Sequence, residues 1–253
     1  METPQIFETP HGRRLAFHQT EGSWPGLVFL GGFKSDMTGT KAVHLEAWAK
    51  ARGMGFLRFD YSGHGQSSEV FEEGSIGEWA DDAQAIIAAR TAGPQVLIGS
   101  SMGGWIALLM TKAIPKRIAG LVTIAAAPDF TEDSMWASFD VDQRAALERD
   151  GQIALPSDYG DPYIITRRLI EEGRNSLVLR DLLDLPFPVR FLQGTADADV
   201  SMDVALRLLD HATGPDMRLV LLKGGDHRFS DLDALKLIED AVENVLQSVK
   251  DHG

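Results

Sequence analysis

The chain has 253 residues and no cysteine, which excludes disulfides, thiolate catalysis and thiolate metal sites. Its 37 acidic residues outnumber the 24 basic ones, and the net charge of -13 argues against nucleic acid or an anionic membrane as the main partner. With 44% hydrophobic residues, the chain is long enough to bury the core of one α/β domain or of two smaller ones.

The amino-terminal residues have neither the basic region nor the apolar stretch of a secretory signal peptide. No apolar run in the sequence approaches the length of a membrane-spanning helix. The absence of cysteine suits a reducing compartment. We therefore expect a cytoplasmic protein without integral membrane association.

The first half of the chain alternates predicted strands with predicted helices. Short apolar runs bounded by turn residues indicate strands, and apolar residues at helical spacing indicate helices. Strands are predicted at 6–9, 14–19, 27–30, 56–59, 95–98 and 118–124. Helices are predicted at 40–52, at 76–91 after a capping box of Ser75 and Glu78, and from residue 105 onward.

The alternation stops at about Asp129 and resumes after about Asp184. Between these points, 141–150 and 163–172 are predicted as amphipathic helices, which we interpret as a small helical cap. The alternation then continues with a strand at 189–193, a helix at 202–211, a strand at 218–222 and a long helix at 232–249.

Strands that alternate with helices form mainly parallel sheets with helices on both faces. The sequence therefore predicts an α/β protein with a mostly parallel sheet of about eight strands. We expect residues 1–128 and 185–253 to form its core and residues 129–184 to be the inserted helical cap. In such a sheet, chemistry gathers at the carboxyl ends of the strands. Polar loops begin at several predicted strand ends, namely at Gly31, Asp60, Ser101, Gly194 and Gly224.

The segment 95–105 places a G-x-S-x-G pentapeptide between a predicted strand and a predicted helix. Its central residue is Ser101, and the turn is too sharp for side chains at Gly99 and Gly103. Such a turn strains the serine backbone, and the helix N-terminus behind it offers N–H groups where an oxyanion would form. The pattern predicts a catalytic nucleophile at Ser101 rather than a connection that merely packs helix on sheet.

A serine hydroxyl needs a base to take its proton, and the base needs an acid to fix its tautomer. Three histidines follow Ser101: His211 closes a predicted helix, His252 lies in the carboxyl-terminal tail, and His227 follows the last predicted strand. This elimination predicts His227 as the base. His64 lies in a Gly-His-Gly turn ahead of the nucleophile, where a structural role is favoured.

The acid has more than one candidate. Asp197 and Asp199 both follow the penultimate predicted strand and qualify by position. Asp60 ends an earlier strand and is the weaker candidate, because it is better placed to bond its own glycine-rich loop.

These residues resemble the active-site motifs of the α/β-hydrolase superfamily, and the resemblance covers nearly the whole chain. Segments 32–42, 58–63, 99–105 and 226–228 are similar to the branch of palmitoyl-protein thioesterases and mycophenolic acid acyl-glucuronide esterases. The resemblance implies hydrolysis of acyl thioesters or activated acyl esters. Gln193 departs from it, because many relatives have histidine there. The chain also lacks a transit peptide, so a bacterial-type cytosolic relative is expected.

The resemblance also assigns roles within the site. The family pattern G-x-x-D-x-x-V selects Asp197 as the acid and leaves Asp199 as a helix cap or a solvated charge. The oxyanion hole of the family uses the N–H of the residue after the nucleophile and one from the loop after the third strand. This implies the backbone N–H groups of Met102 and Phe33, since the glycines at 31 and 32 let the backbone approach closely.

The predicted cap carries several large apolar residues, which are Met135, Trp136, Phe139, Tyr159 and Ile164. Each one alone is more typical of core packing. Some of them must nevertheless face the serine, and we take Trp136, Phe139 and Tyr159 as candidates for contact with an apolar acyl group.

We therefore expect a serine hydrolase that cleaves acyl esters or thioesters through an acyl-enzyme, with a small molecule or an acylated protein as substrate. No cofactor and no metal are expected. One alternative is a simple carboxylesterase or lactonase, since fold does not decide the leaving group. Another is a non-catalytic small-molecule binding protein on a hydrolase scaffold, although a binding protein has no use for a strained nucleophile.

Overall fold

The central sheet has eight strands in the order β1-β2-β4-β3-β5-β6-β10-β12. The computed structural model describes residues 3–156 and 162–252. Strands β1, β2 and β4 pair antiparallel, and each later pair in the order is parallel. The predicted mostly parallel sheet is therefore confirmed. The strands are β1 (Gln5–Glu8), β2 (Arg14–Thr20), β3 (Ser23–Leu30), β4 (Met54–Phe59), β5 (Gln95–Ser100), β6 (Ile118–Ile124), β10 (Val189–Gly194) and β12 (Met217–Leu222).

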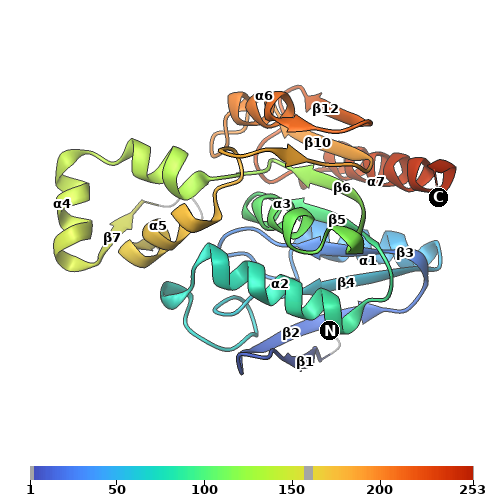
Figure 1. Ribbon diagram of the computed structural model, residues 1–253, viewed down its shortest axis with the longest axis horizontal. Coiled ribbons are helices and arrows are strands. Elements are labelled where there is room, and N and C mark those ends of the chain that lie inside the picture. Colours follow the sequence, from blue (N-terminus) through green and yellow to red (C-terminus); the bar gives the residue numbers. More distant parts are fainter. Residues whose placement is uncertain (1–2, 157–161, 253) are drawn as a thin grey trace.

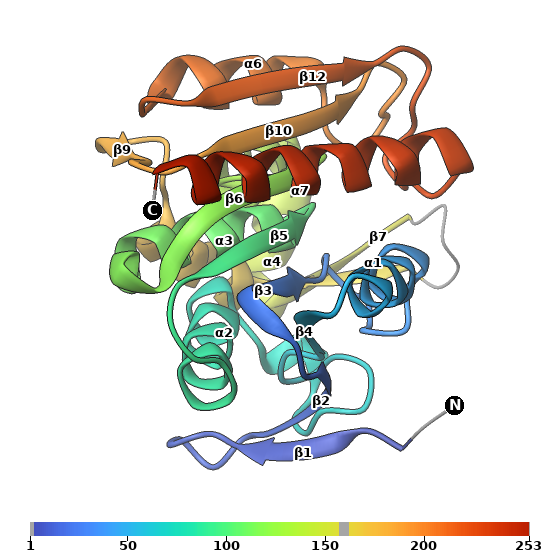
Figure 2. The same ribbon diagram turned by 90° about the vertical axis from the view of Figure 1, so that its right-hand side faces the viewer.

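Helices cover both faces of this sheet (Figure 2). One face is covered by α1 (Thr40–Ala51) and α7 (Leu232–His252), and the other by α2 (Ile76–Arg90), α3 (Met102–Ala113) and α6 (Met202–His211). Successive residues of β5 point to opposite faces, so Val96 and Ile98 pack on the first core and Leu97 on the second. Both faces are buried, as is usual for parallel strands.

Between β6 and β10 the chain leaves the sheet, and Figure 1 shows α4, β7 and α5 to one side of it. Strands β7 and β8 pair antiparallel, so this segment is not built from helices alone. Its elements are η3 (Thr131–Trp136, a π-helical turn), α4 (Val141–Asp150), β7 (Gln152–Leu155), β8 (Tyr163–Thr166), α5 (Arg167–Gly173), η4 (Arg174–Ser176) and β9 (Leu183–Asp184). Outside it lie the short elements η1 (Phe71–Glu73), η2 (Pro115–Arg117) and β11 (Ala212–Thr213).

The helix predicted at 163–172 is wrong over its first four residues, which form β8. These residues include two isoleucines and a threonine, whose branched side chains favour an extended backbone. Pairing with β7 satisfies their backbone groups. The helix begins only after Thr166, whose side chain accepts the N–H of Leu169 at 3.1 Å. Local apolar periodicity could not distinguish this strand from a first helical turn.

The sheet topology brings distant loops together. Because β3, β5, β10 and β12 are parallel, the loops that follow them leave the sheet at the same edge. These loops carry the residues singled out in the sequence. Over residues 3–156 and 162–252, no helix is both long and apolar enough to cross a membrane.

Candidate active site

Ser101 lies in the sharp turn between β5 and α3, with φ 54° and ψ -120°. Glycine is required on both sides of it. A Cβ on Gly99 would lie 2.4 Å from the Gly103 carbonyl oxygen, and a Cβ on Gly103 would lie 2.0 Å from the Leu30 carbonyl oxygen. The Ser101 N–H donates to the Ile124 carbonyl at 2.9 Å, which fixes the turn against β6. The strained turn inferred from the sequence is therefore present.

A hydrogen-bonded chain of side chains starts at this serine. The Ser101 Oγ lies 3.0 Å from Nε2 of His227, and Nδ1 of His227 lies 2.9 Å from Oδ2 of Asp197. In the tautomer that carries its proton on Nδ1, His227 donates to the carboxylate and accepts the serine O–H. Such an arrangement can transfer the serine proton to the imidazole while the carboxylate fixes the ring.

The carboxylate of Asp197 is fully buried and has several hydrogen-bond donors. Its Oδ1 accepts the N–H groups of Asp199 at 2.9 Å and of Val200 at 2.8 Å. Burial acts to raise the pKa of Asp197, but the hydrogen bonds from His227 and the Val200 N–H outweigh it and hold the pKa below its ordinary value. The group is therefore ionised at neutral pH. Asp199 is exposed and supports this carboxylate through its own N–H.

Gln193 completes the surroundings of the acid, and the sequence reasoning missed its role. Its Nε2 donates to Oδ2 of Asp197 at 3.0 Å and to the Val200 carbonyl at 3.0 Å. It is fully buried at the end of β10. A polar residue at the end of a buried strand is a signal that could have found it, because buried amides need hydrogen-bond partners.

The loop after β3 lies directly against Ser101. A Cβ on Gly32 would lie 3.4 Å from the Ser101 Cβ, within van der Waals contact of the serine. Phe33 and Met102 both line the same cavity as Ser101. The two residues predicted to supply oxyanion N–H groups thus lie beside the serine, one on each of the two segments that the family pattern requires.

The cavity around Ser101 has a volume of about 570 Å³ and is shared between the core and the segment 129–184. Its apolar wall includes Phe33, Phe130, Met135, Leu155, Tyr163 and Ile165. Its charged lining residues are Lys34, Asp36, Lys41, Asp199 and Arg228. A cavity with an apolar wall and a few polar groups suits a ligand with an apolar portion.

Two of the three predicted contact residues of the cap, Trp136 and Phe139, do not occur among the described residues that line this cavity. The Trp136 ring centroid lies 4.8 Å from the Arg144 guanidinium and 5.1 Å from that of Arg174, and Phe139 is 5% exposed within the core. Tyr159 lies outside the described residues.

Met135, the residue before Trp136, does line the cavity. Both residues belong to the π-helical turn η3, over which the sequence predicted no helix. The sequence pattern therefore could not show which of the two adjacent side chains faces the cavity.

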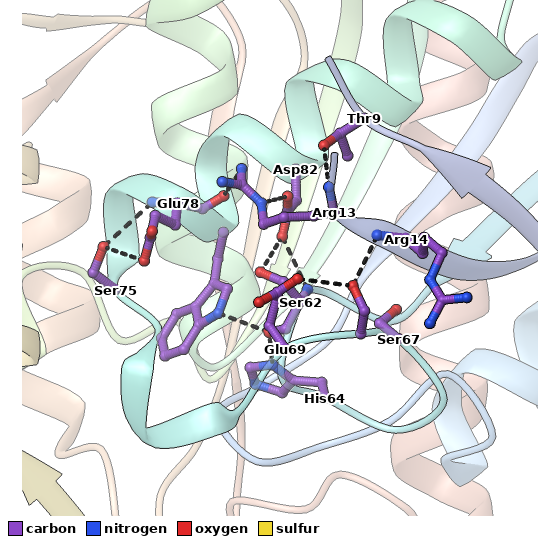
Figure 3. Close-up of polar contacts among 12 residues, drawn as sticks. Thr9, Arg13, Arg14, Ser62, His64, Ser67, Glu69, Ser75, Glu78 and Asp82 are labelled. Atoms are coloured by element: carbon purple, nitrogen blue, oxygen red, sulfur yellow. Dashed lines mark hydrogen bonds and ion pairs between the residues drawn. The ribbon is translucent and has the colours of Figure 1, made fainter. Parts of the chain in front are cut away.

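His64, by contrast, lies in a buried cluster away from this chain of hydrogen bonds. The Asp82 carboxylate accepts hydrogen bonds from Nε of Arg13 and from Oγ of Ser62. His64 lies below Ser62 in Figure 3. The His64 Nδ1 lies 3.1 Å from the Ser62 carbonyl oxygen, while Nε2 is buried without a hydrogen-bond partner. The rings of Tyr61, Phe71 and Trp79 pack edge-on against it.

Burial lowers the pKa of His64 to about 4, so the ring is neutral at neutral pH. The carboxylate of the nearby Asp60 is also engaged in hydrogen bonds within its own surroundings. It accepts the N–H groups of Met37 at 2.6 Å and Gln66 at 2.8 Å. Both observations agree with the structural roles favoured from the sequence.

One group of possible cation ligands exists among the described residues. Oxygen and nitrogen atoms of Asp197, Asp199 and His227 lie within 4.8 Å of one another. Two of these residues already share the hydrogen bond that orients the histidine, so a cation bound there would compete with that bond. The expectation that no metal or cofactor is needed stays a prediction.

Comparison with known proteins identifies a matching family profile and similar hydrolases. The family profile of serine aminopeptidase S33 (Hydrolase_4) matches residues 27–149. The mitochondrial palmitoyl-protein thioesterase ABHD10 of Rattus norvegicus is 32% identical over 98% of this chain and 84% of that protein.

Solved structures agree in fold. A crystal structure of an Agrobacterium vitis S4 protein is 36% identical, with a TM-score of 0.92 over 96% of this chain and 98% of that one. The mouse α/β-hydrolase domain-containing protein 10 is 31% identical, with a TM-score of 0.90 over 97% of this chain and 99% of that one.

Proposed function

The chain belongs to the α/β-hydrolase family that includes the mitochondrial thioesterase ABHD10, and on that premise we propose that it is a serine hydrolase cleaving acyl esters or acyl thioesters through an acyl-enzyme. One observation carries the proposal above all others. The Ser101 Oγ lies 3.0 Å from His227, which itself lies 2.9 Å from the carboxylate of Asp197. A nucleophile, a base and an orienting acid in this order are what acyl transfer to serine requires.

In the first half of the reaction, the Ser101 oxygen attacks the substrate carbonyl carbon as His227 takes the hydroxyl proton. The new carbon–oxygen bond leaves a negative charge on the carbonyl oxygen, which the N–H groups of Phe33 and Met102 stabilise. His227 then gives its proton to the leaving alcohol or thiol, the bond to that group breaks, and an ester of Ser101 remains. Asp197 stays ionised and stabilises the imidazolium throughout.

In the second half, water replaces the leaving group. His227 takes one proton from water as its oxygen attacks the acyl carbon, and the same two N–H groups hold the oxyanion. The proton returns to the Ser101 oxygen as the carboxylic acid departs. The sum is hydrolysis of one acyl bond with the enzyme restored, and no electrons are exchanged.

The acyl group belongs, in this proposal, to the apolar part of the cavity. Phe130 and Met135 come from the segment 129–184 and line the cavity opposite the core residues. We therefore assign the role of a cap to residues 129–184, on a core formed by 1–128 and 185–253. Its substrate-facing residues are Phe130, Met135 and Tyr163 rather than Trp136 and Phe139.

The ABHD10 relative named above is a mitochondrial palmitoyl-protein thioesterase. A fatty acyl thioester, on a small molecule or on a protein, is accordingly the first substrate class to test here. A cytoplasmic location remains our expectation for this chain, and fractionation of the host cell with an antibody against the protein tests it.

A fluorophosphonate probe tests the nucleophile directly. The wild type is expected to gain one probe mass on the peptide that contains Ser101, and Ser101→Ala is expected to gain none. Ser100→Ala is the matched control, because it removes the adjacent buried hydroxyl and leaves the nucleophile. Labelling that persists in Ser101→Ala and disappears in Ser100→Ala would transfer the role to Ser100.

A panel of acyl thioesters, aryl esters, acyl-glucuronides and lactones of graded chain length tests the leaving group. We expect turnover that rises with acyl length up to the limit of the cavity. Binding of the panel without any turnover, in protein that also fails to react with the probe, would instead support a binding protein on a hydrolase scaffold.

A further inference from the structure

The turn that carries His227 is fixed at several points. Oδ1 of Asp226 accepts the N–H of Phe229 at 3.1 Å. Phe229 has a φ of 49°, and its side chain is fully buried in the core between the sheet and α7. A non-glycine residue keeps such a φ only where its surroundings impose it. The position of the catalytic ring therefore depends on contacts outside the triad.

One of these contacts comes from a helix far away in the sequence. Lys41, in the first turn of α1, donates from Nζ to the carbonyl oxygen of Arg228, the residue after His227. The Ser230 Oγ donates to the same oxygen at 2.9 Å. The Arg228 peptide group is thus held from two sides, one of them by an ammonium group. Bonds to a charged donor are roughly twice as strong as neutral ones.

The location of Lys41 is energetically unfavourable for a charged ammonium group. It is partly buried and lines the cavity that contains Ser101. Burial lowers its pKa to about 8, and the negative charge of Asp226 only partly offsets this. The charged groups near it are Asp226 and Arg228 of the histidine turn, and Lys34, Asp36 and Asp199 from the neighbouring loops of the same cavity. A lysine that served stability alone would be better placed in water.

We propose that Lys41 is a positioning residue for the base: its ammonium group holds the Arg228 carbonyl and thereby keeps the His227 ring aligned between Ser101 and Asp197. The inference rests on the proposed serine hydrolase function. Lys41 touches neither the substrate nor the reacting atoms in this role. Its effect reaches the reaction through the angle and position of the imidazole, so it acts on kcat more than on KM.

The protonation of Lys41 gives a second consequence. Below a pH of about 8 the amine is charged and the bond to the carbonyl is at its strongest. As pH rises through that value, the group loses its charge and the bond weakens. We therefore expect kcat for a short acyl ester to fall at alkaline pH as Lys41 loses its proton.

The experiment compares Lys41→Met, Lys41→Arg and Lys50→Met on a short aryl ester. Lys50 is an exposed lysine in the last turn of the same helix, and its variant is expected to match the wild type. Lys41→Met is expected to lose about tenfold in kcat with KM little changed, since it removes one charge-assisted hydrogen bond. Lys41→Arg is expected to recover most of kcat and to shift the alkaline limb upward, because guanidinium does not titrate there.

The outcomes separate this inference from the function on which it rests. Loss of turnover and of probe labelling in Ser101→Ala, together with a wild-type kcat and pH profile in Lys41→Met, would retain the hydrolase and overturn the role of Lys41. A wild-type activity of Ser101→Ala would overturn the hydrolase first. If Lys41→Met fails to fold, Lys41→Arg decides, and an unchanged alkaline limb in that variant refutes the inference.

Discussion

Two histidines of this protein lie in similar loops and have opposite surroundings. His64 follows β4 in a Gly-His-Gly turn, and His227 follows β12 in a Gly-Gly-Asp-His turn. The His64 ring is packed among aromatic rings, with one nitrogen unpaired and the pKa lowered to about 4 by burial. The His227 ring is partly exposed and bonded on both nitrogens, to a buried carboxylate and to a serine hydroxyl.

The comparison shows that glycine-rich context at a strand end does not make a base. Burial among apolar rings disfavours the charged form of an imidazole, whereas a nearby carboxylate favours it. At His227, Nδ1 lies 2.9 Å from the carboxylate of Asp197, whose own pKa is held below its ordinary value. At His64 the carboxylate of Asp82 is bonded to Arg13 and Ser62 instead.

The largest difference in kcat is expected between variants of the two histidines. His227→Ala is expected to lower kcat for a p-nitrophenyl ester by about 10⁴-fold or more, as loss of the base does in serine proteases. His64→Leu should keep kcat within a few-fold of the wild type once folding is confirmed by circular dichroism. Comparable losses in both variants would contradict the distinction.

The two candidate acids should differ nearly as much. Asp197→Asn is expected to lower kcat by about 10³–10⁴-fold, because the amide no longer fixes the proton on the Nδ1 of His227. Asp199→Asn keeps the backbone N–H that supports Asp197 and should stay within a few-fold of the wild type. Steady-state kinetics on one ester checks both, and the reverse ranking would show that Asp199 is the acid.

A smaller effect concerns stability rather than activity. The pKa of His64 is about 4 in the folded protein, against an ordinary value of 6.5 for an exposed ring, so the unfolded chain binds the proton first as pH falls. Stability from this group is therefore complete above pH 6.5 and is lost as pH falls toward 4. Between pH 7 and 5 the loss should be about 2 kcal/mol in the free energy of unfolding.

Urea denaturation of the wild type and His64→Leu at both pH values measures this contribution. The difference between them isolates His64 from the carboxylates that titrate in the same range. Equal losses of stability in the two proteins would mean that His64 is not held neutral by burial.

The smallest effect applies the same reasoning to the cap, where two adjacent residues differ in what they face. Met135→Ala should lower kcat/KM more for long acyl chains than for acetyl esters, by roughly 0.8 kcal/mol per methylene that loses its contact. Trp136→Ala should change all chain lengths alike, since its ring packs on Arg144 and Arg174. Chain-length preference that moves with Trp136 and not with Met135 would restore the assignment made from the sequence.

The sequence alone determined the sheet, most helices and the turn at Ser101. Strand and helix periods are local properties, and the predicted 118–124, 141–150 and 202–211 coincide with the observed β6, α4 and α6. The need for glycine at positions 99 and 103 could be predicted for a similar reason, since the steric limits of one turn involve only a few neighbouring residues. His227 could be selected because it alone of three histidines follows a strand at the active edge of the sheet, whereas position left Asp197 and Asp199 open and the family resemblance selected Asp197.

Only the tertiary structure decided which side chains meet across elements. Strand β8 pairs with β7, and within the turn η3 Met135 rather than Trp136 lines the cavity. The bond of Lys41 could not be predicted either, since the Arg228 carbonyl that accepts it belongs to a loop far from α1 in the sequence. Contacts of this kind depend on distances set by the packing of the whole chain, which no local pattern of residues records.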